Sequence, residues 1–526
     1  MSKRRPPATP LWLVLAALAT CLPFLGKHLA LDEESYLWIA ARFDPTRPYA
    51  WARAWPPWDA TDGFVYAHPP LHLAWMALFA PLADSLWLVR VLAGAPFVAL
   101  YAWAVARLAA ATCHHPGLAA GVWLASTTVL LGLHDSLMID LPACALATAA
   151  VAAWREGQRE EATDARWQLA AGALIGLALA TKYSMLMVAA PLALHALRRR
   201  RGAAAAALAL GVFVAVEAAV FVAHGRVHLL EVWLRRGEIE AGPLAPRLLG
   251  TLARAALLPL PLALVVARPT LGAVGLGLAV AALAWARPAG LGVGENTGLL
   301  ALTALGGTLF ARGLIAAAAS RGHRRKGDRD DAFLLGAWLV AVFLGVTFGH
   351  NYASARYLLP ASAPAALLLV RAAEEVRGGK AMVRASILIS AVVGGVVAVA
   401  DARFAAAGDE VARSAVARVE ERGEPPGRFA GEWSFRAAME RSGWTRYRPG
   451  ETLAAGTVVI VAENASPGTV PVDAWEPIDL VESRDLFRVR VVDAAHDVSL
   501  HAETLGVMPL GWRRAPLEAA TIWRVR

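Results

Sequence analysis

The stretch "LALDEESYLWIAARF" (29–43) places three carboxylates, Asp32, Glu33 and Glu34, directly after the first apolar run of the chain. This run begins near Leu11 and is about 20 residues long, which is the length a helix needs to cross the hydrocarbon core of a membrane. Charged side chains are costly inside a membrane, and where they occur they usually mark a functional site. The stretch therefore predicts a membrane helix whose end carries a group of acids with a chemical task.

The whole chain has the composition of an integral membrane protein. It contains 526 residues, of which 57% are hydrophobic and only 18% are charged, whereas soluble domains carry about 25% charged residues. Apolar runs of about 17 to 25 residues recur from Leu11 to about Ala400. The net charge of +9 comes mostly from short basic clusters between these runs, which is typical of cytoplasmic loops, and no nucleic-acid partner is expected.

Charged loops predict the orientation of the helices. Lys3, Arg4 and Arg5 put the N-terminus in the cytoplasm, and the basic stretches at 198–201 and 320–331 mark further cytoplasmic loops. The first apolar run is interpreted as an uncleaved helix rather than a signal peptide. We therefore expect an all-α polytopic membrane protein with about thirteen transmembrane helices. Its first extracytoplasmic loop (31–85) is long, and the proline-broken segment 68–83 in it predicts an interfacial helix.

Two domains are predicted. Residues 1–400 form the transmembrane domain, and residues 401–526 form a small soluble α/β domain outside the membrane, since no apolar run in them is long enough to span. Alternating residues in "TVVIVAEN" (457–464) and "LFRVRVV" (486–492) predict strands, and "FRAAMERSG" (435–443) predicts a helix. No catalytic set is visible in this tail. The three cysteines lie in or next to apolar segments and predict no disulfides.

The predicted topology collects unusual polar residues at the outer ends of the helices. They are Asp32, Glu33, Glu34, His68, Arg90, Asp140, Lys182, His350, Tyr352 and Arg356. Such residues are tolerated at the rim of a water-accessible cavity, where they can pair with one another or with a ligand. The sequence therefore predicts an active cavity at the outer boundary of the membrane.

Six motifs carry a resemblance to a known family. They are "LDEESYLWIAARF" (31–43), "HPPLHLAWMALFAPL" (68–82), "LVRVLAG" (88–94), "HDSLMIDLP" (134–142), "GLALATKYSMLM" (176–187) and "ARYLLPASAP" (355–364). In this order and spacing they resemble the GT-C superfamily of polytopic membrane glycosyltransferases, in particular bacterial relatives of protein O-mannosyltransferases (glycosyltransferase family 39) and of the lipid A aminoarabinose transferase. The architectural similarity covers residues 10–400, but the specific motifs amount to about 40 residues.

The resemblance implies an activity. Such enzymes transfer a hexosyl or pentosyl group from a polyprenyl-phosphate donor, usually with inversion, to a lipid, protein or cell-envelope acceptor at the outer face of the plasma membrane. This reaction needs a base for the acceptor hydroxyl and positive charge for the departing phosphate.

The catalytic candidates are Asp32, Glu33 and Asp140. Asp32 matches the acidic position that the family has in its first loop, so it is expected to act as base or to position the acceptor. Glu33 is the second choice from the same motif. Asp140 lies in the second loop of the family pattern and would bind the acceptor, orient a cation or accept a proton. Each has a simpler interpretation, since Asp32 could be an exposed acid at a helix end and Asp140 an N-cap.

The candidates for binding the carrier phosphate and the sugar are mostly basic or aromatic. They are His68, Arg90, Lys182, Tyr352, Arg356 and Tyr357. Lys182 matches the family's lysine, and the guanidinium of Arg356 can hold two phosphate oxygens at once. The simpler alternatives are a snorkelling lysine, a membrane-anchoring arginine and an aromatic belt formed by the tyrosines. Arg90 is expected to pair with a carboxylate of the first loop. At the position of His68 relatives often have a basic or acidic residue, and the histidine departs from a lysine that could contact the carrier there.

A cofactor is left open. Glu33, His68 and Asp140 could contribute to a divalent metal site, but no spacing defines one. No glycine-rich nucleotide loop is present, and no inner loop is long enough for a nucleotide-sugar domain, which favours a lipid-linked donor. The main alternative is a polytopic transporter or a flippase for lipid-linked sugars, which would move its substrate without bond chemistry. A membrane-anchored scaffold that displays the tail is a third interpretation.

Overall fold

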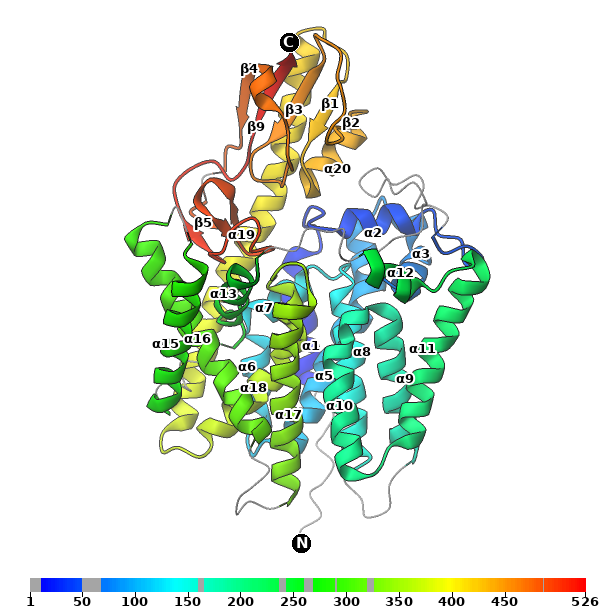
Figure 1. Cartoon of the computed structure of the whole chain (residues 1–526), viewed down its shortest axis with the longest axis vertical. Coiled ribbons are helices and arrows are strands. Elements are labelled where there is room, and N and C mark those ends of the chain that lie inside the picture. Colours follow the sequence, from blue (N-terminus) through cyan, green and yellow to red (C-terminus); the bar gives the residue numbers. More distant parts are fainter. Residues whose placement is uncertain are drawn as a thin grey trace.

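The computed structural model describes residues 11–49, 68–158, 165–235, 243–259, 268–288, 291–318, 326–485 and 487–526. It consists of a broad layer of helices with a smaller sheet-containing part above one end of that layer (Figure 1). The N-terminal side of the layer lies opposite the sheet-containing part, and short helices and loops lie between the layer and the sheet. This arrangement matches the predicted class of a mostly helical protein with a small C-terminal α/β region.

The first half of the chain forms helices with short breaks. Their bounds are α1 (Leu11–Cys21), η1 (Leu22–Phe24), α2 (Glu33–Ala40), α3 (Leu71–Ala77), η4 (Ala80–Leu82), α4 (Leu86–Val89), η5 (Arg90–Gly94), α5 (Ala95–Thr112), α6 (Pro116–Leu124), α7 (Thr127–His134), α8 (Asp140–Glu156), α9 (Ala165–Thr181), η6 (Tyr183–Met185) and α10 (Leu186–Arg199).

The second half continues in the same way until the sheet begins. Its helices are α11 (Ala203–His224), α12 (His228–Arg235), α13 (Leu244–Ala255), α15 (Pro269–Ala286), α16 (Val293–Ala318), α17 (Lys326–Leu344), η8 (Gly345–Gly349), η9 (Arg356–Ala361), α18 (Ser362–Ala373) and α19 (Gly379–Glu421). The helical segments predicted from the apolar runs therefore form helices, with one unpredicted bend of 64° between α6 and α7.

Six helices in the described part of the chain are long and apolar enough to span a membrane, or seven if the bent pair α6 and α7 counts as one span. The others in the layer are shorter; α8 and α9 have 17 residues each and α10 has 14. The membrane character is thus confirmed, while the predicted number of about thirteen spans stays a prediction. The predicted interfacial segment forms the short helices α3 and η4.

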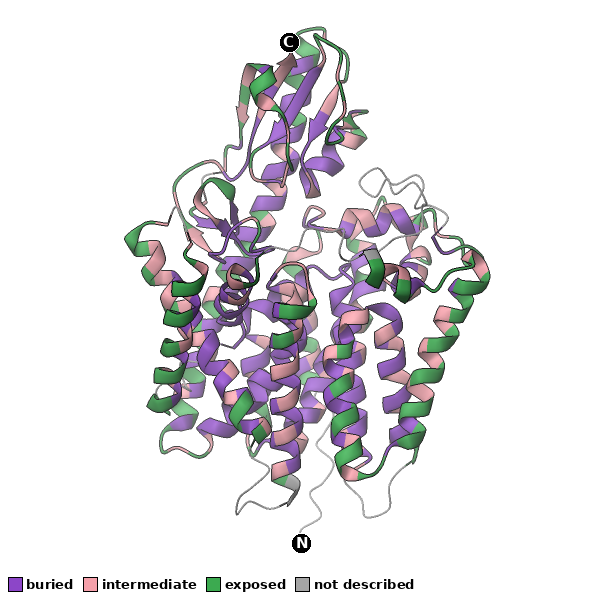
Figure 2. Ribbon diagram, in the orientation of Figure 1, coloured by how far each residue is buried: buried purple, intermediate pink, exposed green. Residues whose placement is uncertain are grey.

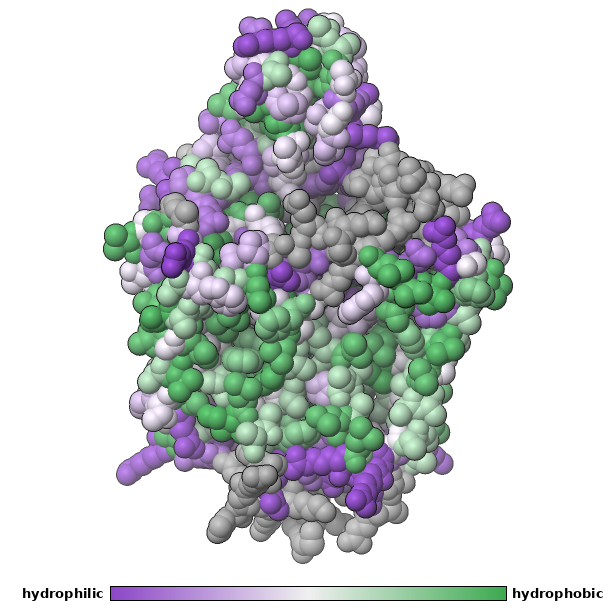
Figure 3. Space-filling view, viewed as in Figure 1, coloured by the Kyte–Doolittle hydropathy of each residue, from purple (hydrophilic) through white to green (hydrophobic). Residues whose placement is uncertain are grey.

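The surface of the helical layer changes with height. On the face shown in Figure 3, apolar side chains form a band across its middle, and polar side chains collect below this band and on the part above it. Ion pairs tie the lower ends of the helices together, for example Arg155 to Asp331 at 2.6 Å and Arg199 to Asp330 at 2.7 Å. An apolar band with polar rims is the pattern that a bilayer imposes on a spanning protein.

The interior of the layer is closely packed. Figure 2 shows that α8 is purple along most of its length, and residues of α5, α8 and α18 supply much of the largest hydrophobic core. α11 and α15 lie at the periphery, where much of their surface is exposed. Small residues allow close approach; a Cβ at Gly94, for example, would stand 2.6 Å from the Cβ of Ser136. Such packing by small residues is typical of membrane helices.

Two helices end in wide π-helical turns beside the loops that carry the predicted site. η5 begins at Arg90 and leads into α5, and η8 extends α17 to Gly349, just before the loop that contains Tyr352. Single π-turns inside α-helices occur frequently at functional sites, because they shift the register of side chains by one position. Here each π-turn sets the direction of a segment that contributes to the polar residues above the layer.

α19 continues from the membrane layer into the C-terminal part without a break. It has 43 residues and passes through residue 400, where the sequence places the domain boundary. Its upper half contributes Val411, Ala415 and Val419 to a second core, together with Phe435 of α20 (Trp433–Arg441). The helix predicted around 435–443 is thus confirmed.

The C-terminal sheet has five strands in the order β2-β1-β3-β9-β4. Their bounds are β1 (Arg428–Ala430), β2 (Thr445–Arg446), β3 (Val458–Ala462), β4 (Trp475–Glu482) and β9 (Ala519–Val525). β1 pairs in parallel with β2 and β3, whereas β9 is antiparallel to β3 and β4. Every residue of β3 is buried, so the strand predicted within "TVVIVAEN" is the centre of this sheet.

The second segment predicted to form strand, "LFRVRVV" (486–492), does so in its described residues but lies outside that sheet. Its described residues form the two-residue strands β5 (Val489–Arg490) and β6 (Val492–Asp493), which pair with β8 (Gly511–Trp512) and β7 (Val498–Ser499) in separate hairpins. The valines that created the alternating pattern are buried against membrane helices, since Val489 and Val491 share a core with Leu131 and Val397. The segment 487–513 therefore returns to the helical layer.

Arg254 on α13 fastens this returning segment. Its guanidinium is fully buried and donates to the backbone carbonyls of Ser499 and Gly506, the latter at 2.8 Å, and to that of Leu500 at 3.3 Å. A buried guanidinium surrounded by carbonyl oxygens fixes backbone positions, because an unpaired buried cation is strongly unfavourable. The hairpins are thus bound to the top of the helical layer.

Glu518 makes the stability of the sheet dependent on pH. It is fully buried; its Oε1 accepts hydrogen bonds from the backbone N–H groups of Glu463, Asn464 and Ala519, and no described group reaches its Oε2. Burial raises the pKa of Glu518 to about 8, against about 4.3 in an unfolded chain. Between these values the folded state keeps a proton that the unfolded state has lost, so stability falls as pH rises from about 4.5 to about 8.

Replacement of Glu518 by glutamine is expected to remove most of this pH dependence. Glutamine keeps an acceptor for the three backbone N–H groups but cannot ionise. Thermal unfolding of the full-length protein in detergent should therefore give a lower midpoint at pH 8 than at pH 5 for the wild type, and a smaller difference for E518Q. An equal difference in both proteins would contradict this role of Glu518.

Candidate active site

Asp32 and Arg356 form an ion pair that joins the two ends of the membrane layer's sequence. Asp32 precedes α2, Arg356 begins η9, and Arg356 Nη1 donates to Asp32 Oδ2 at 2.9 Å. The Asp32 side chain is 44% exposed and the Arg356 side chain 18% exposed. Asp32 stands at the N-cap position of α2 but makes no capping hydrogen bond. Its carboxylate therefore binds Arg356 and remains partly accessible.

Two tyrosines surround the guanidinium of Arg356. Arg356 Nη2 donates to the hydroxyls of Tyr352 at 3.2 Å and Tyr357 at 3.4 Å, and the Tyr357 hydroxyl donates to that of Tyr352 at 2.7 Å. The His350 ring stacks on Tyr357 with centroids 4.1 Å apart. Both tyrosines are thus directly bound to the predicted phosphate contact, rather than belonging only to an aromatic belt.

Lys182 and Asp140 form a second pair beside the first. Lys182 Nζ donates to Asp140 Oδ1 at 2.6 Å and lies 4.7 Å from the centre of the Tyr357 ring. Lys182 is 3% exposed and Asp140 is 5% exposed, so the lysine does not snorkel to the surface. Asp140 is the first residue of α8 and makes no capping hydrogen bond, so the N-cap interpretation is wrong. Its Oδ2 is buried and has no hydrogen-bond partner among the described residues.

These contacts join side chains from distant parts of the chain. Asp32 binds Arg356, Arg356 binds Tyr357, Lys182 lies over the Tyr357 ring, and Lys182 binds Asp140. The charges of Arg356 and His350 also act on Asp140. Six of the sequence-predicted residues therefore form one connected cluster: Asp32, Asp140, Lys182, Tyr352, Arg356 and Tyr357.

His68 lies near this cluster, but its ring does not carry the positive charge that a phosphate contact needs. Burial, together with the positive charges of Lys182 and Arg356, holds the pKa of His68 well below its usual range. The ring is therefore neutral at pH 7. It can accept or donate one hydrogen bond at a ligand, but it adds no positive charge.

Glu33 and Arg90 form a separate, fully buried pair. Arg90 Nη2 donates to Glu33 Oε2 at 2.8 Å, and Arg90 Nη1 donates to the carbonyls of Leu25 at 3.1 Å and Lys27. The two side chains are at most 1% exposed. The expected pairing of Arg90 with a loop carboxylate is confirmed, but roles for Glu33 as base and for Arg90 as substrate contact are not supported, because neither side chain is accessible.

Replacement of Arg90 by methionine is expected to destabilise the protein by about 3–5 kcal/mol, because it leaves the buried charge of Glu33 without a partner. The double variant E33Q/R90M should regain part of this loss, since it buries no charge. Thermal or denaturant unfolding of the purified proteins measures both. A wild-type stability for R90M would contradict the structural role of the pair.

The predicted metal set is not brought together. Among the described residues, no group of three His, Cys, Asp or Glu side chains is arranged to hold a metal ion. Glu33 is occupied by Arg90, and Asp140 by Lys182. The residues Glu33, His68 and Asp140 therefore do not fit a metal site.

A buried network of charges, which the sequence did not indicate, lies next to the cluster. Lys27 Nζ donates to both Asp135 and Asp401, and His501 Nε2 lies 3.1 Å from the other oxygen of Asp401. Lys27 is 1% exposed in its side chain. Lys27 lies only five residues before Asp32 in the sequence. His501 comes from the returning C-terminal segment, where the sequence predicted no functional residue.

A small cavity connects the network to the cluster. It has about 30 Å³ of free volume, which is enough for one or two water-sized groups. Its polar lining residues are Thr128, Asp135, Asp140, Arg356 and His501, and the others are mainly leucines. Residues of both polar groups thus line the same space.

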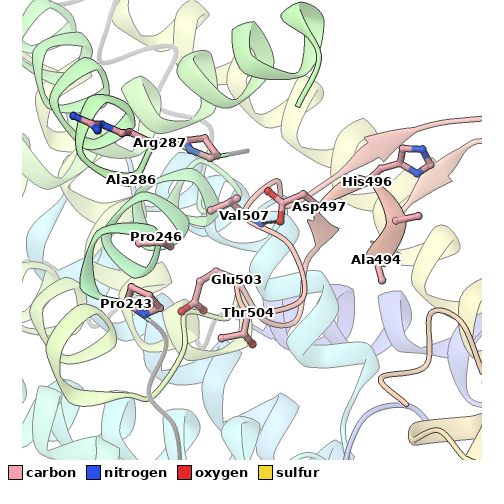
Figure 4. A pocket seen from close by; sticks show the side chains of 12 residues that line it. Pro243, Pro246, Ala286, Arg287, Ala494, His496, Asp497, Glu503, Thr504 and Val507 are labelled. Atoms are coloured by element: carbon pink, nitrogen blue, oxygen red, sulfur yellow. Dashed lines mark hydrogen bonds between the residues drawn. The ribbon is translucent and has the colours of Figure 1, made fainter. Parts of the chain in front are cut away.

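A larger cavity of about 460 Å³ lies between α13, the end of α15 and the C-terminal hairpins (Figure 4). Pro243 and Arg287 line it from the helical layer, and Asp497 and Glu503 line it from the hairpins. None of the sequence-predicted residues lines it. Glu503 Oε2 accepts a hydrogen bond from the backbone N–H of Ala353, so this cavity lies behind the loop that carries Arg356.

The comparisons with known proteins give only distant similarities. No family model matches the chain, and no curated protein matches it. Two solved structures of ArnT from Cupriavidus metallidurans align over 86% of this chain and 92% of ArnT: one bound to undecaprenyl phosphate (15% identity, TM-score 0.45) and one in the apo state (16%, 0.38). The arabinofuranosyltransferase AftD from Mycobacteria aligns over 99% of this chain and 40% of its own (16%, 0.39). Similarities at this level assign no activity to the chain.

Proposed function

We propose that this protein is a membrane glycosyltransferase that moves a sugar from a polyprenyl-phosphate donor to a lipid, protein or cell-envelope acceptor. The observation that carries the proposal is the cluster itself. Asp32, Asp140, Lys182 and Arg356 come from four distant segments and form one connected group through Tyr357. The cluster thus offers carboxylates that can act as the base and cations that can stabilise the departing phosphate, which are the two elements that glycosyl transfer from a phosphate needs.

The phosphate of the carrier binds between Arg356 and Lys182 in this proposal. Arg356 already has the hydroxyls of Tyr352 and Tyr357 at hydrogen-bond distance, and these O–H groups can also donate to phosphate oxygens. A guanidinium can hold two oxygens of a phosphate, and the buried ammonium of Lys182 adds a second positive charge. As the bond between the sugar and the phosphate breaks, these groups stabilise the charge that develops on the leaving phosphate.

Asp32 is the base. Its Oδ2 accepts a hydrogen bond from Arg356, and 44% of its side chain is exposed. When the phosphate binds the guanidinium of Arg356, the carboxylate of Asp32 becomes available to the acceptor hydroxyl. The acceptor oxygen forms a bond to the anomeric carbon, its proton passes to Asp32, and the carbon–phosphate oxygen bond breaks, which leaves a polyprenyl phosphate. Asp140, held by Lys182, binds a hydroxyl through its free Oδ2.

The polar cluster lies on the side of the helical layer that faces the sheet, opposite the basic residues Arg198 and Arg199 at the end of α10. Under the positive-inside rule this side is the outer one, so transfer takes place at the outer face of the plasma membrane. The N-terminus is then cytoplasmic. Residues 1–400 form the catalytic domain, and residues 401–526 form an extracytoplasmic α/β domain that covers the cavity.

The experiment supplies purified protein in proteoliposomes with radiolabelled polyprenyl-phosphate hexoses and pentoses, and with a membrane extract as acceptor. A transferase consumes the donor, releases polyprenyl phosphate and places the label on a new product. A flippase leaves the donor intact and changes only its side of the membrane. Intact donor with every sugar, or a changed side without cleavage, would overturn the proposal.

A further inference from the structure

His501 is held so that one ring nitrogen is used and the other is free. Its Nε2 lies 3.1 Å from Asp401 Oδ1 in an ion-pair contact, and Lys27 in turn binds the opposite oxygen of Asp401. No described group bonds to the Nδ1 atom. A carboxylate that accepts from one nitrogen of a histidine fixes the tautomer and leaves a lone pair on the other nitrogen. Nδ1 of His501 is therefore oriented as a hydrogen-bond acceptor.

The small cavity places a second unused acceptor near His501. His501 and Asp140 both line it, and Asp140 Oδ2 is buried without a partner among the described residues. A buried carboxylate oxygen with no partner costs about 1–3 kcal/mol, so a ligand that donates to it binds favourably. The cavity has about 30 Å³ of free volume, which accommodates a hydroxyl group and a water but not a sugar ring.

We infer that this cavity is a subsite for one hydroxyl group of a sugar, which donates its proton to Nδ1 of His501, while a water beside it donates to Oδ2 of Asp140. The inference rests on the proposed function. The sugar is the one attached to the carrier, because Arg356 lines the same cavity and is the proposed phosphate contact. The hydroxyl groups of a sugar bonded to that phosphate lie close to Arg356. His501 thus determines which donor sugar is bound, and this residue comes from the C-terminal segment.

The test compares two variants, each of which removes the function of one ring nitrogen of His501. In H501Q the amide nitrogen can replace Nε2 and keep the bond to Asp401, but nothing replaces Nδ1. In H501N the amide can replace Nδ1, but the bond to Asp401 is lost. A purely structural role of His501 predicts that H501N is the damaging change, whereas a hydroxyl subsite predicts that H501Q is.

The readout is the affinity of wild type and both variants for polyprenyl-phosphate hexoses and pentoses, each also prepared with single hydroxyls replaced by hydrogen. One deoxy donor should bind the wild type roughly 3- to 10-fold more weakly than its parent. H501Q should bind this deoxy donor and the parent equally, and H501N should keep the difference while unfolding at lower temperature.

Three results would overturn the inference. H501Q could lose the same factor for every donor, including polyprenyl phosphate without a sugar. The wild type could bind all deoxy donors like their parents. A deoxy acceptor series could show the loss that disappears in H501Q, which would assign the hydroxyl to the acceptor. Because binding is measured separately from turnover, a protein that discriminates donors but transfers nothing disproves the proposed function alone.

Discussion

Replacement of Asp32 by asparagine is expected to lower the rate of sugar transfer by about 10²- to 10⁴-fold, which is the usual contribution of a general base. Asparagine has nearly the same shape and can still contact Arg356, so the site should stay assembled. It cannot accept the proton of the acceptor hydroxyl. Donor affinity should change little, because Asp32 leaves the guanidinium when phosphate binds.

Single-turnover rates and donor affinity of purified D32N against wild type check this prediction. Asp44 provides a matched control, since it lies on the same first loop, is exposed, and its carboxylate accepts hydrogen bonds from the nearby Thr46. D44N should therefore transfer sugar at the wild-type rate. Full turnover by D32N, with D44N unchanged, would exclude Asp32 as the base.

Replacement of Arg356 by alanine is expected to lower kcat/KM for the donor by about 10²- to 10³-fold. The change removes the group proposed to hold the phosphate and to stabilise its developing charge, and a single such group contributes about this much. R356K should recover only part of the loss, because an ammonium cannot hold two phosphate oxygens in the manner of a guanidinium.

The control for Arg356 is Arg403, whose side chain is 50% exposed and pairs with Asp485 on the C-terminal part. R403A removes the same charge at a distance from the cluster and should leave donor kcat/KM unchanged. A further check is the affinity for polyprenyl phosphate without a sugar, which R356A should lower. An R356A protein that binds polyprenyl phosphate as the wild type does would remove Arg356 from the phosphate site.

The sequence predicted the helices and most of the cluster for a clear physical reason. Long apolar runs are local signals, and charged residues at their ends are too costly to be accidental. Asp32, Lys182 and Arg356 each interrupt or border such a run, so each could be recognised individually. Their convergence follows once the helices pack side by side with these ends on the same side.

The roles within "DEE" could not be separated in the same way. Neighbouring residues on a helix point about 100° apart, so one of Asp32 and Glu33 can face a cavity while the other faces the core. Which one does so depends on where α2 packs. Arg90 decides this, since it binds Glu33 beneath the loop and thereby leaves Asp32 facing Arg356.

The network around His501 could not be predicted because it depends on contacts over hundreds of residues. Lys27 and Asp401 are 374 positions apart, and His501 reaches them only because the segment 487–513 turns back onto the membrane helices. The alternating valines in that segment have the same pattern as a sheet strand. Burial against helices and burial in a sheet leave the same trace in a sequence.

Because α19 has no break, its length affects the orientation of the C-terminal sheet. A helix of 43 residues is about 65 Å long and turns about 100° with each residue. One residue added below Asp401 would rotate this carboxylate and the sheet above it by more than a quarter of a circle, away from Lys27 and from the cavity. The orientation of the C-terminal sheet relative to the helical layer is therefore determined by the number of residues in α19.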